Sequence, residues 1–218
     1  MDAALPSGAT SHDFFRRARA RLSLDVPSAL DDPTVEAKRG DLDLDPAMWE
    51  QAGVKATRPA AVLIPVIDRS EPAVLLTLRT ELPSHPGQIA FPGGKIEPQD
   101  RTPADAALRE AAEEIGLARA LIEPIGYLDL YLTFSGFRIL PTVARVAPDY
   151  KLVLSEREVA DAFEVPLTFL MDAQNHALHS RDWKGVTRRY YAMPFGERYI
   201  WGVTAGILRN LYERIYEG

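Results

Sequence analysis

Three glutamates in one short stretch are the residues of this chain best suited to chemistry. Glu110, Glu113 and Glu114 stand at i, i+3 and i+4 in a segment rich in Ala, so a helix would bring their carboxylates to one face. Like charges this close repel each other, and Arg109, four residues before Glu113, offsets only part of the charge. Carboxylate oxygens without Cys or His are ligands that Mg²⁺ and Mn²⁺ prefer. The spacing therefore predicts a site for a hard divalent cation, the alternative being a solvated acidic helix face.

The helix that would carry these glutamates has recognisable ends. Thr102 is suited to the N-cap, Pro103 to the first helical position and Gly116 to the C-terminal stop. Upstream, Gly93 and Gly94 lack side chains and would let the backbone approach a metal ion or a phosphate closely. The sequence thus predicts a glycine-rich strand end that faces an acidic helix.

The stretch from Phe91 to Leu117 resembles the Nudix box, whose pattern is G-x5-E-x7-R-E-U-x-E-E-x-G-U with U an aliphatic residue. The second half of the pattern is matched by Arg109, Glu110, Ala111, Glu113, Glu114, Gly116 and Leu117. The first half departs from it, because Asp100 replaces Glu and eight residues rather than seven separate Asp100 from Arg109. The CoA-pyrophosphatase branch of the family looks similar, with GG-x-x-[DE]-x-x-D followed by A-L-R-E-x-x-E-E. The departure therefore favours this branch.

The resemblance implies a hydrolase that cleaves a pyrophosphate bond with the help of Mg²⁺ or Mn²⁺. The metal ligands that it implies are Glu110, Glu113, Glu114 and the carbonyl oxygen of Gly94. Arg109 would orient the glutamates, and Glu113 or Glu158 would orient the attacking water or take its proton. Glu158 is chosen because it resembles the Glu of the branch's E-V-x-x-x-F-x-V-P-L segment, with a surface charge as the alternative.

Two further segments are expected to contact the substrate. Residues 75–94, LLTLRTELPSHPGQIAFPGG, look like the motif L-L-T-x-R-[ST]…H-x-G-Q…F-P-G-G of CoA pyrophosphatases. The contacts to phosphate or nucleotide that this similarity implies are Arg79, His85, Gln88 and Gly93, the alternative being a hydrogen-bonded structural loop. Phe134 and Phe137 flank Gly136 where Nudix relatives carry a substrate-side loop, and either ring is suited to stack on adenine. A simple hairpin turn is the alternative there.

Coenzyme A, free, acylated or oxidised, is the predicted substrate, and the expected products are 3′,5′-ADP and 4′-phosphopantetheine. One alternative is another nucleoside diphosphate linked to a group X, such as ADP-ribose or a dinucleoside diphosphate. Another is a catalytically silent module that binds a nucleotide, against which the presence of all three carboxylates argues. A purely structural role ranks last, because it requires an acidic face that holds nothing.

Composition excludes several other classes. The net charge of −6, from 25 basic and 31 acidic residues, disfavours broad electrostatic binding to nucleic acid. The absence of cysteine excludes a disulfide, a thiol nucleophile and a cysteine metal site. No stretch has the length and apolar character of a transmembrane helix, and the first residues lack an apolar signal region. We therefore expect a cytoplasmic enzyme with a small-molecule substrate and without nucleic-acid or membrane partners.

The hydrophobic pattern predicts an α/β/α sandwich with a mixed sheet, which is also the fold that the resemblance implies. This domain is expected to cover residues 58–218. Strands are predicted at 58–67, 71–79, 88–91, 125–132, 138–146 and 158–165, with a hairpin formed by 177–182 and 188–193. Besides the glutamate helix, helices are predicted at 167–173 and 201–216.

Residues 1–57 are predicted to form an N-terminal extension. Residues 11–22 show the pattern of a basic amphipathic helix with Ser11 as its cap, and a linker with one helical turn near 46–51 follows. Packing against the domain and contact with a second copy in a homodimer are the two favoured uses of its apolar side. A membrane-surface helix is the alternative, but the apolar side is small for that role.

Overall fold

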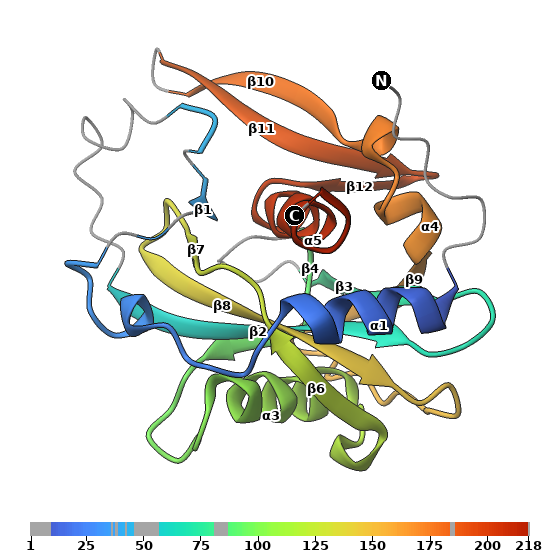
Figure 1. Cartoon of the computed structure of the whole chain (residues 1–218). Helices are drawn as coiled ribbons and strands as arrows, with labels where there is room; N and C mark the ends of the chain where they lie inside the picture. Colours follow the sequence, from blue (N-terminus) through green and yellow to red (C-terminus); the bar gives the residue numbers. More distant parts are fainter. Residues whose placement is uncertain are drawn as a thin grey trace.

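A nine-stranded mixed sheet forms the middle layer of the structure, a computed structural model that describes residues 10–35, 37, 39–41, 43–45, 57–80, 87–183 and 186–217 (Figure 1). Its central strands, β2 (Arg58–Ile67) and β8 (Phe137–Val146), pair in parallel along their whole length. β2 is almost continuously apolar and β8 is mostly apolar, as expected for strands whose two faces are both covered. The other strands are β1 (Arg39–Gly40), β3 (Ala73–Arg79), β4 (Ile89–Ala90), β5 (Gly93–Lys95), β6 (Ile122–Tyr127), β7 (Tyr131–Leu132) and β9 (Val159–Pro166).

The order of the sheet brings the glycine-rich segment to its centre. Along the main path the order is β1-β7-β8-β2-β3-β4, with β5 paired to β2, β6 to β8 and β9 to β3. Gly94 on β5 therefore lies opposite Ala61 on β2, and the start of β2 lies beside the start of β8, where Arg58 is the register partner of Phe137. The predicted β2–β3 hairpin is present, although its pairing is confined to Val66–Val74 and Ile67–Ala73.

The glutamate helix, α3 (Pro103–Ile115), covers one face of the sheet. The side chain of Thr102 accepts a hydrogen bond from the backbone N–H of Asp105 at 3.1 Å, and Pro103 occupies the first turn. Gly116 ends the helix at φ 66°, a left-handed conformation that favours glycine. Both predicted ends of the helix are confirmed. Its apolar side is fully or almost fully buried and consists of Ala106, Ala107, Leu108, Ala111 and Ile115.

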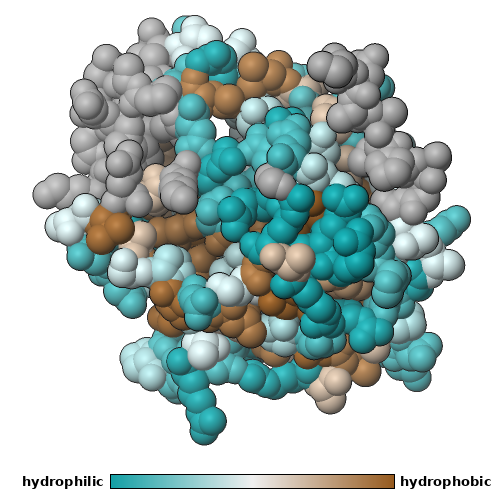
Figure 2. Space-filling view, in the orientation of Figure 1, coloured by the Kyte–Doolittle hydropathy of each residue, from teal (hydrophilic) through white to brown (hydrophobic). Residues whose placement is uncertain are grey.

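Within the described part of the chain, three helices cover the opposite face: α1 (Ser11–Arg21), α4 (Leu167–Leu170) and α5 (Val203–Tyr212), which continues as a π-helical turn, Glu213–Glu217. The predicted α/β/α arrangement is confirmed. The apolar side of α1, carried by Phe14, Phe15 and Ala18, is buried in the same core as α5, and its outer side is hydrophilic (Figure 2). The N-cap of α1 is Thr10 rather than Ser11, because the Thr10 hydroxyl accepts the N–H of Asp13 at 3.2 Å. Among the described helices, none is long and apolar enough to cross a membrane.

A separate three-stranded sheet lies over α5 (Figure 1). It consists of β10 (Ala177–Trp183), β11 (Val186–Phe195) and β12 (Arg198–Trp201). The hairpin of β10 and β11 was expected, but β12 occupies residues that the sequence pattern assigns partly to the last helix. The reason is Gly202, whose φ of 63° and ψ of −133° end the strand and delay the start of α5 to Val203.

Two other segments differ from the sequence-based expectation. The strand expected at 125–132 is two strands, because β6 has a register shift between Pro124 and Gly126 and leaves β8 after Tyr127. β7 then pairs with the first residues of β8. The expected linker contains β1, which pairs in parallel with β7, and a 3-10 turn, Ser28–Leu30. The helical turn expected near 46–51 lies outside the described residues.

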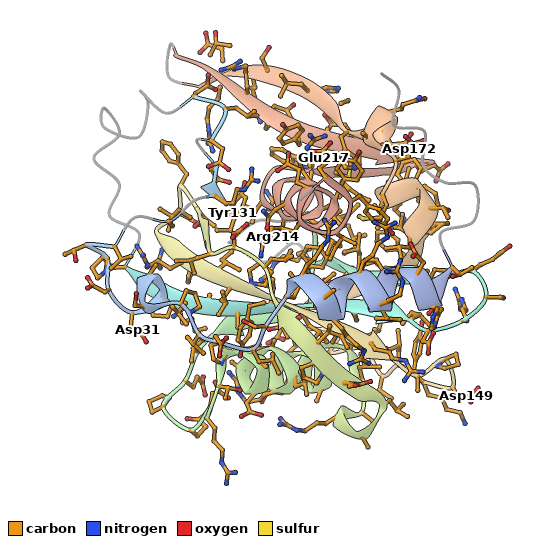
Figure 3. The ribbon with its side chains drawn as sticks, viewed as in Figure 1. Asp31, Tyr131, Asp149, Asp172, Arg214 and Glu217 are labelled. Atoms are coloured by element: carbon orange, nitrogen blue, oxygen red, sulfur yellow. The ribbon has the colours of Figure 1, made fainter. Side chains whose placement is uncertain are left out.

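Reciprocal hydrogen bonds join α1 to the turn after α5. Arg21 Nη1 donates to the carbonyl oxygen of Arg214 at 3.1 Å, and Arg214 Nη2 donates to the carbonyl oxygen of Arg21 at 3.2 Å. Figure 3 shows Arg214 between the C-terminal helix and the layer that contains α1. Nearby, the Arg17 guanidinium lies 5.4 Å from the centre of the Tyr216 ring. The extension is thus anchored to the last helical element of the described chain.

Candidate active site

A cavity of about 1210 Å³ lies between β2, β5, the glutamate helix and the three-stranded sheet. The predicted site residues that line it are Arg79, Gln88, Gly93, Gly94, Glu110, Glu114, Phe134, Phe137 and Glu158. Arg109 and Glu113 are not among the lining residues. His85 lies outside the described residues. Nine of the predicted residues, from segments far apart in the sequence, are thus brought to one place.

Glu110 and Glu114 face this cavity from α3. Glu114 is 5% exposed, and its Oε2 accepts a hydrogen bond from the backbone N–H of Gly93 at 3.2 Å. The guanidinium of Arg79 lies at ion-pair distance, with Nη1 4.0 Å from Glu114 Oε1. Gly94 packs so closely on Glu110 that a Cβ atom at this position would overlap the carboxylate. The absence of a side chain at Gly94 therefore lets the Glu110 carboxylate lie against β5.

Glu113 points away from the cavity. Its side chain is 58% exposed, and Arg109 Nη1 contacts Glu113 Oε2 at 3.1 Å. Successive residues of an α-helix are about 100° apart, so Glu110 and Glu114 lie about 40° apart while Glu113 lies about 100° from Glu114. A shared face in the i, i+3, i+4 pattern therefore does not bring all three carboxylates to one point. Glu158, from the turn before β9, lines the cavity together with Glu110 and Glu114.

Arg109 connects the acidic residues beside the cavity. Its Nε and Nη2 donate to the two carboxylate oxygens of Asp100, both at 3.1 Å, and its Nη1 contacts Glu110 Oε1 at 3.0 Å. Nη2 also donates to the carbonyl oxygen of Lys95 at 3.1 Å. The hydrogen bond from Arg109 is the main reason why the pKa of Asp100 is lowered from its usual value. Asp100, the shorter acid of the box, thus fixes Arg109, and Arg109 in turn fixes Glu110.

Burial and mutual repulsion disfavour the charged form of the carboxylates in the cavity, and Arg79 and Arg109 offset only part of this effect. Burial raises the pKa of Glu114 to about 7, and the nearby charges of Glu110 and Glu158 act in the same direction. Burial likewise raises the pKa of Glu110, to which the charges of Glu113 and Glu158 contribute. Within the described ranges, no group of three His, Cys, Asp or Glu side chains is arranged to hold a metal ion. The donor set nevertheless fits a hard divalent cation, because it consists of oxygen ligands whose repulsion such a cation would relieve.

The other side of the cavity is formed by arginines and aromatic rings. The Arg58 guanidinium lies 4.0 Å from the centre of the Phe137 ring, and that of Arg188 lies 4.4 Å from the Phe134 ring. Phe134 belongs to a turn in which the Thr133 hydroxyl accepts the N–H of Phe137 at 2.9 Å. The lining residues on this side that the sequence did not indicate include Arg58, Arg181, Arg188, Tyr190, Tyr191 and Trp201.

The N-terminal extension also contributes to the cavity wall. Asp41 Oδ2 accepts the backbone N–H of Phe134 at 2.7 Å, and the Tyr131 hydroxyl donates to Asp41 Oδ1 at 3.3 Å. Arg188 Nη2 lies 3.5 Å from Asp41 Oδ2. Tyr131 on β7 lies close to the C-terminal helix, where its ring contacts Gly206 (Figure 3). Asp41 therefore holds the turn that carries Phe134. No motif in the sequence indicated this role.

Comparisons with known proteins identify the family of this chain. The family profile described as NUDIX domain matches residues 57–184. The Nudix hydrolase NudL of Yersinia enterocolitica is 39% identical over 157 residues, which cover 72% of this chain and 80% of that protein. NudL of Enterobacter sp. (strain 638) is 39% identical over 155 residues, covering 71% and 81%.

Among solved structures, a NUDIX hydrolase from Alicyclobacillus acidocaldarius is similar with a TM-score of 0.48 and 19% identity, covering 75% of this chain and 95% of that one. Family membership is carried by the profile match and the NudL identity. Since the profile spans more than half of the chain and includes the glycines and the glutamate helix of the site, this protein belongs to the Nudix family.

Proposed function

We propose that this protein is a metal-dependent pyrophosphohydrolase of coenzyme A that releases 3′,5′-ADP and 4′-phosphopantetheine. The observation that carries the proposal is one cavity in which acidic residues for pyrophosphate chemistry face a wall of arginines and aromatic rings suited to a nucleotide. Membership of the Nudix family supports hydrolysis of a pyrophosphate bond. The similarity of residues 75–94 to CoA pyrophosphatases supports coenzyme A as the substrate.

A divalent ion, Mg²⁺ or Mn²⁺, would neutralise phosphate oxygens and lower the pKa of a bound water. Glu110, Glu114 and the Gly94 carbonyl are the residues that we propose to hold it, together with Glu113 once that side chain turns from Arg109. Arg109 keeps Glu110 in place through the bonds described above. The proposed role of these residues is therefore to bind the metal ion and to orient its ligands.

Other predicted residues that line the cavity are proposed to activate the water and to contact the substrate. Water attacks one phosphorus atom of the pyrophosphate, the bridging P–O bond breaks, and the water proton passes to a carboxylate, for which we propose Glu158. Arg79, which already lies near Glu114, is placed to contact a phosphate oxygen, and Gln88 and Gly93 line the same part of the cavity. Phe134 and Phe137 would stack on the adenine ring.

The test is an assay of the purified protein with coenzyme A, ADP-ribose and a dinucleoside polyphosphate, each with Mg²⁺, with Mn²⁺ and with a chelator. We expect metal-dependent release of 3′,5′-ADP from coenzyme A, detected by chromatography, and little cleavage of the others. Cleavage of ADP-ribose alone would keep the hydrolase and remove coenzyme A as its substrate. Absence of cleavage in every case would favour a nucleotide-binding module. The mass of the protein in solution tests the homodimer expected from the sequence.

Gly94→Ala is expected to lower turnover by about 10- to 100-fold with little loss of stability. The new Cβ would overlap the Glu110 carboxylate, which is the end of a flexible side chain and can move aside. A displacement of this kind is comparable to losing a residue that orients a metal ligand. The measurement is kcat with saturating metal ion, together with the thermal midpoint. Unchanged kcat would show that the position of Glu110 against Gly94 does not matter to the reaction.

A further inference from the structure

Two arginines face each other in the cavity wall. Arg181 on β10 and Arg188 on β11 are direct register partners, and both line the cavity. Directly opposite side chains of an antiparallel pair have Cβ atoms about 4.5–5.5 Å apart, and like charges so placed destabilise the pair. This arrangement becomes favourable when a negatively charged group lies between the two guanidinium groups.

The protein's own carboxylates supply only part of that negative charge. Arg188 has Asp41 at 3.5 Å, and the neighbouring Arg189 is held by Asp45, with Nε 2.9 Å from Oδ1. The side chain of Arg181 makes no hydrogen bond or ion pair with any residue in the part of the chain that the structure describes. The Arg181–Arg188 pair therefore keeps an excess of positive charge that points to an anionic ligand.

The pair lies next to the ring proposed for the base. Arg188 covers Phe134 at 4.4 Å from the ring centre. The wall continues from Phe134 through Phe137 and Arg58 to the start of β2. Further along β2, Ala61 is the register partner of Gly94, which lies beside Glu110. A ligand that spans this wall would have its pyrophosphate at the carboxylates, its base at Phe134 and any group attached close to the base at Arg181 and Arg188.

We infer that Arg181 and Arg188 bind the 3′-phosphate of the nucleotide, a phosphomonoester attached to the ribose beside the base. The inference rests on the proposed function for the identity of the substrate. Guanidinium groups recognise phosphate through paired, charge-assisted hydrogen bonds, which lysine or glutamine cannot reproduce in the same geometry. The pair would thus distinguish coenzyme A from substrates without a 3′-phosphate, such as ADP-ribose.

The experiment measures binding without turnover, by calorimetric titration of 3′,5′-ADP and of 5′-AMP. We expect the wild-type protein to bind 3′,5′-ADP about 10- to 100-fold more tightly, which is the range for hydrogen bonds to charged groups. Arg181→Gln should reduce this ratio by at least about 10-fold, and Arg181→Lys should restore part of it. Arg198→Gln is the matched control, since Arg198 belongs to the same sheet, pairs with Asp161 and does not line the cavity.

Equal affinity of the wild-type protein for the two nucleotides would overturn the inference, as would an unchanged ratio in Arg181→Gln. Either result leaves the proposed function intact if coenzyme A is cleaved. Conversely, a ratio that depends on Arg181 in a protein that does not cleave coenzyme A would retain the phosphate site and reject the proposed function. Thermal midpoints of the variants, which are expected to match the wild type because Arg181 is exposed, exclude misfolding as the cause.

Discussion

Glu114→Gln is expected to lower the turnover of coenzyme A by more than about 100-fold with the fold retained. Residues that only orient a metal ligand contribute about 10- to 100-fold, so the loss of a direct ligand should exceed that range. Glutamine has nearly the same volume and can still accept the N–H of Gly93, but it lacks the charge that a divalent ion requires. The measurement is kcat over a range of Mg²⁺ and Mn²⁺ concentrations.

Two matched variants make this prediction specific. Glu156→Gln alters an exposed acid outside the cavity and should leave kcat unchanged. Glu113→Gln should cause a smaller loss than Glu114→Gln, because Glu113 is exposed and bound to Arg109. Full turnover by Glu114→Gln would reject its role as a metal ligand. Equal losses at both positions would mean that Glu113 turns into the site when the metal ion binds.

Glu114→Gln is also expected to stabilise the metal-free protein at alkaline pH. The pKa of Glu114 is raised by burial to about 7, compared with 4.5 for an ordinary glutamate. Below pH 4.5 the group is protonated in both the folded and the unfolded state. As the pH rises from 4.5 to 7, the unfolded chain releases a proton that the folded protein retains, so the free energy of unfolding falls. Above about pH 7 both states are deprotonated, and the loss of unfolding free energy caused by the buried carboxylate has reached its full value.

At about 1.4 kcal/mol for each tenfold change in an ionisation constant, the destabilisation amounts to about 3 kcal/mol. Glu114→Gln, which resembles the protonated side chain, should therefore unfold with a higher free energy than the wild type at pH 8, and the difference should vanish below pH 4.5. Denaturant unfolding in the presence of a chelator measures both values. Adding Mn²⁺ should stabilise the wild type more than the variant. Parallel pH profiles for the two proteins would contradict the proposed burial of a charged carboxylate.

Local signals made part of this site predictable. The ends of α3 depend on a capping hydroxyl, a proline and a glycine that act on their own helix, so Thr102, Pro103 and Gly116 could be assigned without knowledge of the fold. The sequence pattern likewise indicated strands at β2 and β8, although not that both would be central in the sheet. Gly93 and Gly94 were expected near the acidic helix because the motif places all of them in one segment.

The other half of the site depends on contacts between distant segments. Asp41 meets Phe134 only because β1 joins the sheet beside β7, and a two-residue strand leaves no periodic signal. Arg181 and Arg188 become partners through the register of a hairpin whose exact pairing the sequence does not reveal. The direction of Glu113 follows from the rotation of α3 against the sheet, which the packing of its apolar side determines.

The reciprocal bonds of Arg21 and Arg214 have a consequence for biosynthesis. The two residues are 193 positions apart, so the ribosome makes α1 long before the turn that covers it. At roughly 5–20 residues per second, the interval is roughly 10–40 seconds. During this time Phe14 and Phe15, which are buried in the folded protein, have no α5 to pack against. We expect the docking of α1 to be a late event on the nascent chain, and its apolar side to be a natural binding site for chaperones until then.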